Sequence, residues 1–121
     1  MKKLLNYILT ESENAEFDFK PFIAFATKHL KLDEEPKIDI VDVIEGLTAF
    51  GCHNLMDRSI TVAKGGRHQI DVMRTIAHEM VHYKQSATYT PDGQTGSDDE
   101  NEANAVAGII LRDYAQTAFN D

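Results

Sequence analysis

The apolar positions in the first third of the chain recur at helical spacing. One short stripe falls in the first ten residues, at Leu4, Leu5, Ile8 and Leu9. A second stripe begins beside Pro21, and its members are Phe19, Phe22, Ile23, Phe25, Ala26, His29 and Leu30. Apolar residues three and four positions apart share one face of a helix, and proline suits a first helical turn. We therefore expect two N-terminal helices whose aromatic faces pack in the core.

The period of the pattern changes in the middle of the chain. Apolar and polar residues alternate over residues 37–41, and residues 48–52 and 59–63 have the composition of two further strands. Residues 54–58 would form the reversal between the last two, and Gly65-Gly66 would end the sheet region. These segments predict a small three-stranded, mostly antiparallel sheet.

Helical spacing returns over residues 71–85, where one side is apolar at Val72, Met73, Ile76, Ala77, Met80 and Val81. A turn is expected at Pro91-Asp92-Gly93. A last helix should begin at Ser97, which can act as N-cap and is followed three residues later by Glu100, the spacing of a capping box. Asp98 and Asp99 would favour the positive end of that helix. Its packing face would be Ala103, Val106, Ala107, Ile110 and Tyr114.

This order of elements predicts one α+β domain spanning residues 1–121, with N-terminal helices, a small sheet and two further helices. The length suits a single domain, and 42% of the residues are apolar, enough for one modest core.

Charge and composition indicate which partners and which cellular compartment are expected. The formal net charge is -8, so nucleic acid is not an expected partner. No stretch reaches the roughly 20 apolar residues of a membrane span, and the apolar start lacks the cleavage site of a signal peptide. Cys52 is the single cysteine and can form no internal disulfide. A cytoplasmic or otherwise intracellular protein with no membrane contact is expected.

The helix predicted over residues 71–85 contains the sequence His78-Glu79-Met80-Val81-His82, which matches the pattern H-E-x-x-H. Residues four apart lie one turn apart on the same helical face, so both imidazoles can reach one ion at the ~2.0–2.1 Å of a Zn–N bond. Glu79 would lie beside the metal, where it can take a proton from a zinc-activated water and act as general base.

A catalytic zinc usually has three protein ligands and an open position. The chain has no histidine and no cysteine after His82, so carboxylates are the ligands that remain downstream, and they cluster at the start of the last helix. Glu100 is one candidate, although the capping box with Ser97 would occupy its carboxylate. Glu102 is the other.

The segments Ala77-His78-Glu79-Met80-Val81-His82-Tyr83-Lys84-Gln85 and Glu100-Asn101-Glu102-Ala103-Asn104-Ala105 resemble the gluzincin metallopeptidases. The similarity covers roughly residues 48–114. It is closest to the very small minigluzincins, and the chain is also similar to ImmA/IrrE-type proteases.

The resemblance implies a zincin-like fold, a zinc cofactor and peptide-bond hydrolysis. Glu102 matches the family's glutamate ligand, which completes a set with His78 and His82. The small residues that follow it would allow the two helices to approach closely; they are Ala103, Ala105, Ala107 and Gly108. An edge strand within residues 48–53 or 59–63 would pair with an extended peptide or protein substrate.

The chain also departs from the larger enzymes of that clan. Thermolysin-type enzymes carry an aspartate four residues after the ligand glutamate, where this chain has Val106, so Asn104 becomes the candidate hydrogen-bond partner of a ligand histidine. No motif identifies the donor to the oxyanion. Tyr89, His53, His68 and Tyr114 are candidates, each with a structural role as its alternative.

Three other functions fit the same residues. The chain could be a zinc-binding regulatory or interaction module with little or no turnover, although such a module has no need of Glu79 as a base. It could be a zinc amidase acting on a non-protein substrate, because the same metal chemistry would serve. An acidic interaction domain without metal would make the H-E-x-x-H pattern a coincidence.

Overall fold

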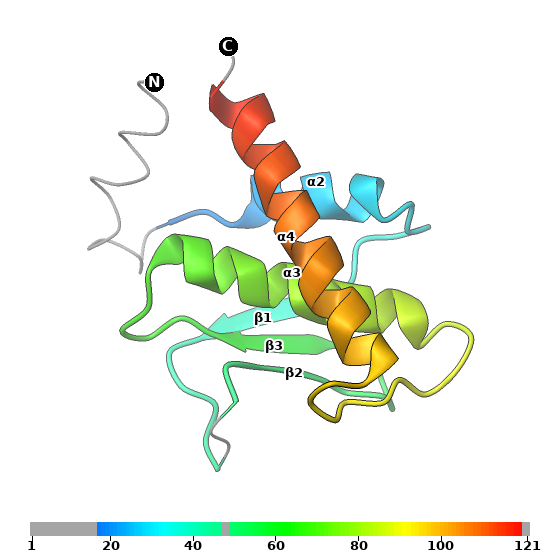
Figure 1. Cartoon of the computed structure of the whole chain (residues 1–121). Helices are drawn as coiled ribbons and strands as arrows, with labels where there is room; N and C mark the ends of the chain where they lie inside the picture. Colours follow the sequence, from blue (N-terminus) through cyan, green and yellow to red (C-terminus); the bar gives the residue numbers. More distant parts are fainter. Residues whose placement is uncertain (1–16, 47–48, 120–121) are drawn as a thin grey trace.

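The computed structural model describes residues 17–46 and 49–119 (Figure 1). Within them the chain forms three helices and three strands, which are α2 (Lys20–His29), β1 (Ile38–Val41), β2 (Gly51–His53), β3 (Ile60–Ala63), α3 (Gln69–Gln85) and α4 (Asp98–Phe119). The predicted α+β class is therefore confirmed. The helix predicted over residues 4–9 lies outside the described residues, as does Thr48 of the second predicted strand.

The three strands form one mixed sheet in the order β1-β3-β2. β2 pairs antiparallel with β3, whereas β1 pairs parallel with β3, with Ile38 opposite Ile60. The prediction of a mostly antiparallel sheet is therefore wrong for one of the two pairs. β1 and β2 follow each other in the sequence but lie at opposite edges of the sheet. The chain then reverses after β2, so that β3 lies between them and runs parallel to β1.

β2 forms an edge of this sheet, and β3 lies at its centre. Phe50 O accepts a hydrogen bond from Ala63 N at 2.8 Å, and Asn54 N donates to Ser59 O at 2.8 Å. Backbone groups alternate in direction along an antiparallel strand. The N–H and C=O groups of Gly51 and His53 therefore point away from β3, towards the open edge.

Helix α3 lies between the sheet and α4 (Figure 1). Its apolar side buries Val72, Ile76 and Met80 completely, against the central strand residues Ile60 and Val62. All six residues of the predicted packing side are thus found in the core. Because α3 is covered on both sides, its polar side chains at buried positions must find partners inside the protein.

Helix α4 crosses α3, and the C-terminal part of α4 packs against α2 (Figure 1). The Tyr114 ring lies 5.2 Å from that of Phe22 and 5.3 Å from that of Phe25, in edge-to-face geometry. His29 Nε2 lies 3.0 Å from Asp113 Oδ2. The other end of α4, its first turn, lies over the C-terminal half of α3, where Glu100 contacts His82 (Figure 1).

Two of the four small residues expected to bring α3 and α4 together do so. Ala103 and Ala107 are fully buried, whereas Ala105 and Gly108 are exposed on the other side of α4. In the described part of the chain, none of these helices has the length and apolar character needed to cross a membrane.

Candidate metal centre

The H-E-x-x-H segment lies in the second half of α3. The helix begins at an unusual N-cap, His68, whose Nδ1 accepts a hydrogen bond from Ile70 N at 3.0 Å. One turn apart on the helix, His78 and His82 face α4 with their ring centroids 4.7 Å apart. His82 is 8% exposed, and the His78 side chain is 18% exposed. Both imidazoles therefore lie on one face of α3, as their spacing predicts.

Helix α4 brings a carboxylate to these two rings from its first turn. Ser97 Oγ accepts a hydrogen bond from Glu100 N at 3.2 Å, which is one half of the expected capping box. The other half is absent, because Ser97 N donates instead to Gln94 O at 3.0 Å. The Glu100 carboxylate is therefore not engaged at the helix end, and it points towards α3.

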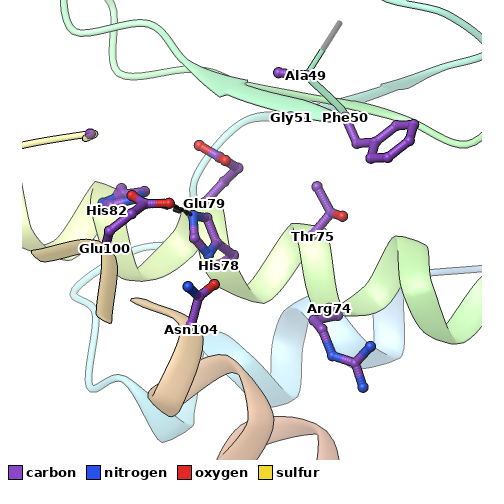
Figure 2. Close-up of a pocket in the computed structure, with 11 residues that line it drawn as sticks. Ala49, Phe50, Gly51, Arg74, Thr75, His78, Glu79, His82, Glu100 and Asn104 are labelled. Carbon is purple, nitrogen blue, oxygen red and sulfur yellow. Dashed lines mark hydrogen bonds and ion pairs between the residues drawn. The ribbon is translucent and has the colours of Figure 1, made fainter. Parts of the chain in front are cut away.

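Glu100 meets both histidines (Figure 2). Its Oε1 lies 3.0 Å from His78 Nε2 and its Oε2 lies 2.7 Å from His82 Nε2, while the two Nε2 atoms are 3.2 Å apart. One ligand atom from each of the three residues lies within 4.8 Å of the others.

The spacing of the three side chains fits a metal ion. Ligand atoms of a tetrahedral zinc site are separated by about 3.3 Å, given Zn–N and Zn–O bonds of about 2.0–2.1 Å. The separations in the cluster are slightly shorter, so the side chains would open by a few tenths of an ångström around an ion. The cluster of His78, His82 and Glu100 could therefore hold a metal ion.

Glu102, the ligand implied by the resemblance, lies elsewhere. It is exposed, and its Oε1 accepts a hydrogen bond from Gln85 Nε2 at 2.8 Å. Residues two positions apart on a helix are offset by about 200° around its axis. In the described part of the chain, the carboxylate grouped with His78 and His82 is that of Glu100. Glu100 is thus the carboxylate that the fold brings to the histidines.

Glu79 lies beside the cluster and under the edge strand β2 (Figure 2). The residue is 8% exposed. Burial raises the pKa of its carboxyl group to about 7, and the negative charge of Glu100 also raises it, whereas His82 lowers it. A carboxyl group that titrates near neutral pH is suited to exchanging a proton with a substrate or water.

The close approach of β2 to Glu79 depends on Gly51. A Cβ atom at this position would lie 3.0 Å from Glu79 Cγ and 2.8 Å from Thr75 Cγ2. No side chain larger than hydrogen fits between the edge strand and the helix at this point. The neighbouring Phe50 ring is held over the Arg67 guanidinium group, at 4.1 Å from the ring centroid to Cζ.

A groove of about 480 Å³ opens over the cluster and runs along α3 (Figure 2). This volume lies within the usual range of small-molecule and substrate sites. The residues that line it come from the segment before β2, from α3, from the loop before α4 and from α4; they are Ala49, Phe50, Gly51, Arg74, Thr75, His78, Glu79, His82, Gly93, Glu100 and Asn104.

Both histidines have a further hydrogen-bond partner besides Glu100. Asn104 hydrogen-bonds His78, as expected of a residue that orients a ligand histidine. Burial nevertheless lowers the pKa of the His78 ring, although Glu100 raises it. His82 Nδ1 lies 2.8 Å from Gln85 Oε1. Sequence reasoning did not single out Gln85, although its position three residues after His82, on the same face of the helix, was a signal that could have done so.

The four candidate donors to an oxyanion are not among the described residues that line the groove. His68 caps α3, and Tyr114 packs against α2. Tyr89 Oη donates to Asp99 Oδ1 at 2.6 Å, and the His53 ring lies 6.0 Å from that of Tyr83. Each of the four thus has a structural contact.

Comparisons of the chain with protein-family models, with curated proteins and with solved structures find no match. The functional conclusion therefore depends on the cluster itself.

Proposed function

We propose that this protein is a zinc-dependent metallopeptidase whose metal ligands are His78, His82 and Glu100. The observation that carries the proposal is the convergence of these three side chains next to a buried glutamate, Glu79. Two imidazoles and one carboxylate form a common ligand set of catalytic zinc, which leaves a fourth position open. When bound, zinc polarises a carbonyl oxygen and lowers the pKa of a water molecule to about 7.

Glu79 supplies the acid–base chemistry in this proposal. Its carboxylate takes a proton from the attacking water and then gives it to the nitrogen of the departing amine. Burial raises the pKa of the Glu79 carboxyl group, which favours its protonated form and so favours this second step. A site that only binds metal for structural reasons would have no use for a buried glutamate there.

The open edge of strand β2 is the observation that favours a peptide as the substrate. The outward N–H and C=O groups of Gly51 and His53 can pair with an extended backbone. Gly51 is also in direct reach of Glu79, so a segment paired with β2 would lie across the entrance to the cluster. Of the two segments considered from the sequence, β3 is central and already paired on both sides, so β2 is the strand available to a substrate.

Glu79→Gln tests this proposal, because it keeps the size of the side chain and removes the base. We expect hydrolysis of fluorescently labelled casein by the zinc-loaded protein to fall by at least about 100-fold, the usual range for loss of an acid–base group. Bound zinc should remain at the wild-type level, since Glu79 is not a ligand.

Glu35→Gln, at an exposed position that does not line the groove, is the matched control and should keep wild-type activity. A zinc-loaded wild-type protein that cleaves neither casein nor short peptides would contradict the proposal. So would full activity in Glu79→Gln.

A further inference from the structure

A chain of hydrogen bonds leads from the His82 ring, away from the groove, to Glu102. His82 Nδ1 lies 2.8 Å from Gln85 Oε1. Gln85 Nε2 then donates to Glu102 Oε1 at 2.8 Å and to the carbonyl oxygen of Asp99 at 3.2 Å. Gln85 is only 5% exposed. The catalytic step proposed above uses neither Gln85 nor Glu102, so their contacts need a separate explanation.

The chemistry of these groups determines the direction of the chain. A carboxylate and a carbonyl oxygen only accept hydrogen bonds, so the NH₂ group of the Gln85 amide must face Glu102 and Asp99. The amide oxygen is then the atom that faces His82. Because that oxygen only accepts, the His82 ring must carry a proton on Nδ1 and donate it. The other ring nitrogen, Nε2, faces Glu100 and His78. Its 2.7 Å contact with Glu100 Oε2 also needs a proton when no metal is bound, and a metal ion would take the place of that proton on the Nε2 lone pair.

We infer that Gln85 is a positioning residue of the metal site, and that Glu102 acts through it by fixing the orientation of its amide. The inference rests on the proposed function, because it concerns the affinity of the same site for its metal. In this inference Glu102 is not a metal ligand; it holds Gln85, which in turn contacts the ligand His82. Hydrogen bonds to the far nitrogen of a ligand histidine fix its tautomer and ring orientation.

The test is a double-mutant cycle on zinc affinity, measured by competition with a chromogenic chelator. Gln85→Leu should weaken zinc binding about 10- to 100-fold, the usual cost of losing such a partner. Glu102→Ala should weaken it less. The double variant should bind no more weakly than Gln85→Leu, because Glu102 has no other route to the metal. Gln116→Leu, an exposed glutamine on α4, is the matched control.

An exchange of the two side chains separates this role from a general effect on folding. Gln85→Glu/Glu102→Gln restores an acceptor for His82 Nδ1 and a donor from residue 102 to that acceptor, but it leaves the Asp99 carbonyl oxygen without its donor. Zinc affinity in this variant should therefore rise above that of Gln85→Leu without reaching the wild-type value, whereas a purely structural role would leave it as weak as in Gln85→Leu. Fully additive effects of the two single substitutions, or an affinity no higher than that of Gln85→Leu, would overturn the inference.

The tautomer can also be measured without metal, by nitrogen-15 NMR of the imidazole rings. We expect His82 Nδ1 to be protonated in the wild type and to lose this preference in Gln85→Leu. A wild-type ring without a proton on Nδ1 would overturn the inference directly. Absence of zinc binding by the wild type would overturn the proposed function with it, whereas equal binding by wild type and Gln85→Leu would overturn the inference alone.

Discussion

Gly51 controls how closely the edge strand β2 approaches the proposed base. In Gly51→Ala, the new Cβ would lie 2.8 Å from Thr75 Cγ2, 3.0 Å from Glu79 Cγ and 3.2 Å from Glu79 Oε2. Carbon atoms in contact are normally about 3.5–4.0 Å apart. All three contacts are therefore too short, and either the strand or the helix side chains must move.

Thr75 cannot easily give way. Its Oγ1 donates to Asp71 O at 3.1 Å and accepts from Arg67 Nη2 at 2.7 Å. The strain would therefore move β2 outwards and turn Glu79 away. Overpacking of this kind costs about 1–3 kcal/mol, and each kcal/mol lowers the melting temperature of a domain of this size by about 4 °C. A displacement of a catalytic group by about 1 Å can cost about 100-fold in turnover.

The assays are thermal unfolding followed by circular dichroism, kcat/KM on a peptide substrate, and bound zinc. We expect the melting temperature to fall by about 4–12 °C and kcat/KM to fall by about 10- to 100-fold, with zinc retained because no ligand is touched. Gly93→Ala is the matched control, since Gly93 lines the same groove and an added Cβ would meet nothing within 4 Å. A Gly51→Ala protein with wild-type melting temperature and kcat/KM would refute the reasoning.

Two further predictions concern stability away from the groove. Gly108→Ala should raise the free energy of unfolding by about 1 kcal/mol, because an added Cβ on this exposed helical position meets nothing within 4 Å and alanine is the better helix former; an unchanged or lower value in urea unfolding would count against this. The hydrogen bond with His29 lowers the pKa of Asp113 below its usual 3.8, so this contact stabilises the fold above pH 3.8 and is lost as the pH falls through the lower value in the folded protein. Asp113→Asn should therefore melt below the wild type at pH 7 and approach it as the pH falls under 3.8; a constant difference across this range would contradict the assignment.

The spacing of apolar residues along the sequence predicted the described helices and strands well, because one face of each element is buried against its neighbours. The predicted helix over residues 71–85 ends where α3 ends, at Gln85, but α3 begins at Gln69. The difference of two residues arises because His68 serves as N-cap through its ring nitrogen, and histidine is not among the side chains by which N-caps are recognised.

The pairing of the strands could not be predicted in the same way. Alternation along residues 37–41 indicates a strand but not its neighbour. That neighbour is determined by the connection between β1 and β2, which carries the chain to the opposite edge of the sheet. Only the reversal between β2 and β3 had a local signal, and that pair was predicted correctly as antiparallel.

The sequence brought the α3 residues together, but it left two carboxylates of α4 as candidates. His78, Glu79 and His82 lie close together, as the spacing of their motif predicts. The family resemblance favoured Glu102, and the capping box, which is a local rule, assigned the Glu100 side chain to Ser97. In the fold, Ser97 N donates to Gln94 O, and the Glu100 carboxylate contacts the imidazoles of the half-buried His78 and the buried His82 on the facing helix instead.

The most direct test of the metal site is the number of zinc ions per chain, measured by plasma mass spectrometry on protein purified without chelator or metal-affinity resin. We expect close to one zinc per chain in the wild type and in Glu102→Ala, and loss of zinc in Glu100→Ala, whose substitution removes the carboxylate nearest both histidines. A wild-type protein that holds no zinc and takes up none on titration, or zinc retained in Glu100→Ala but lost in Glu102→Ala, would contradict the proposed centre.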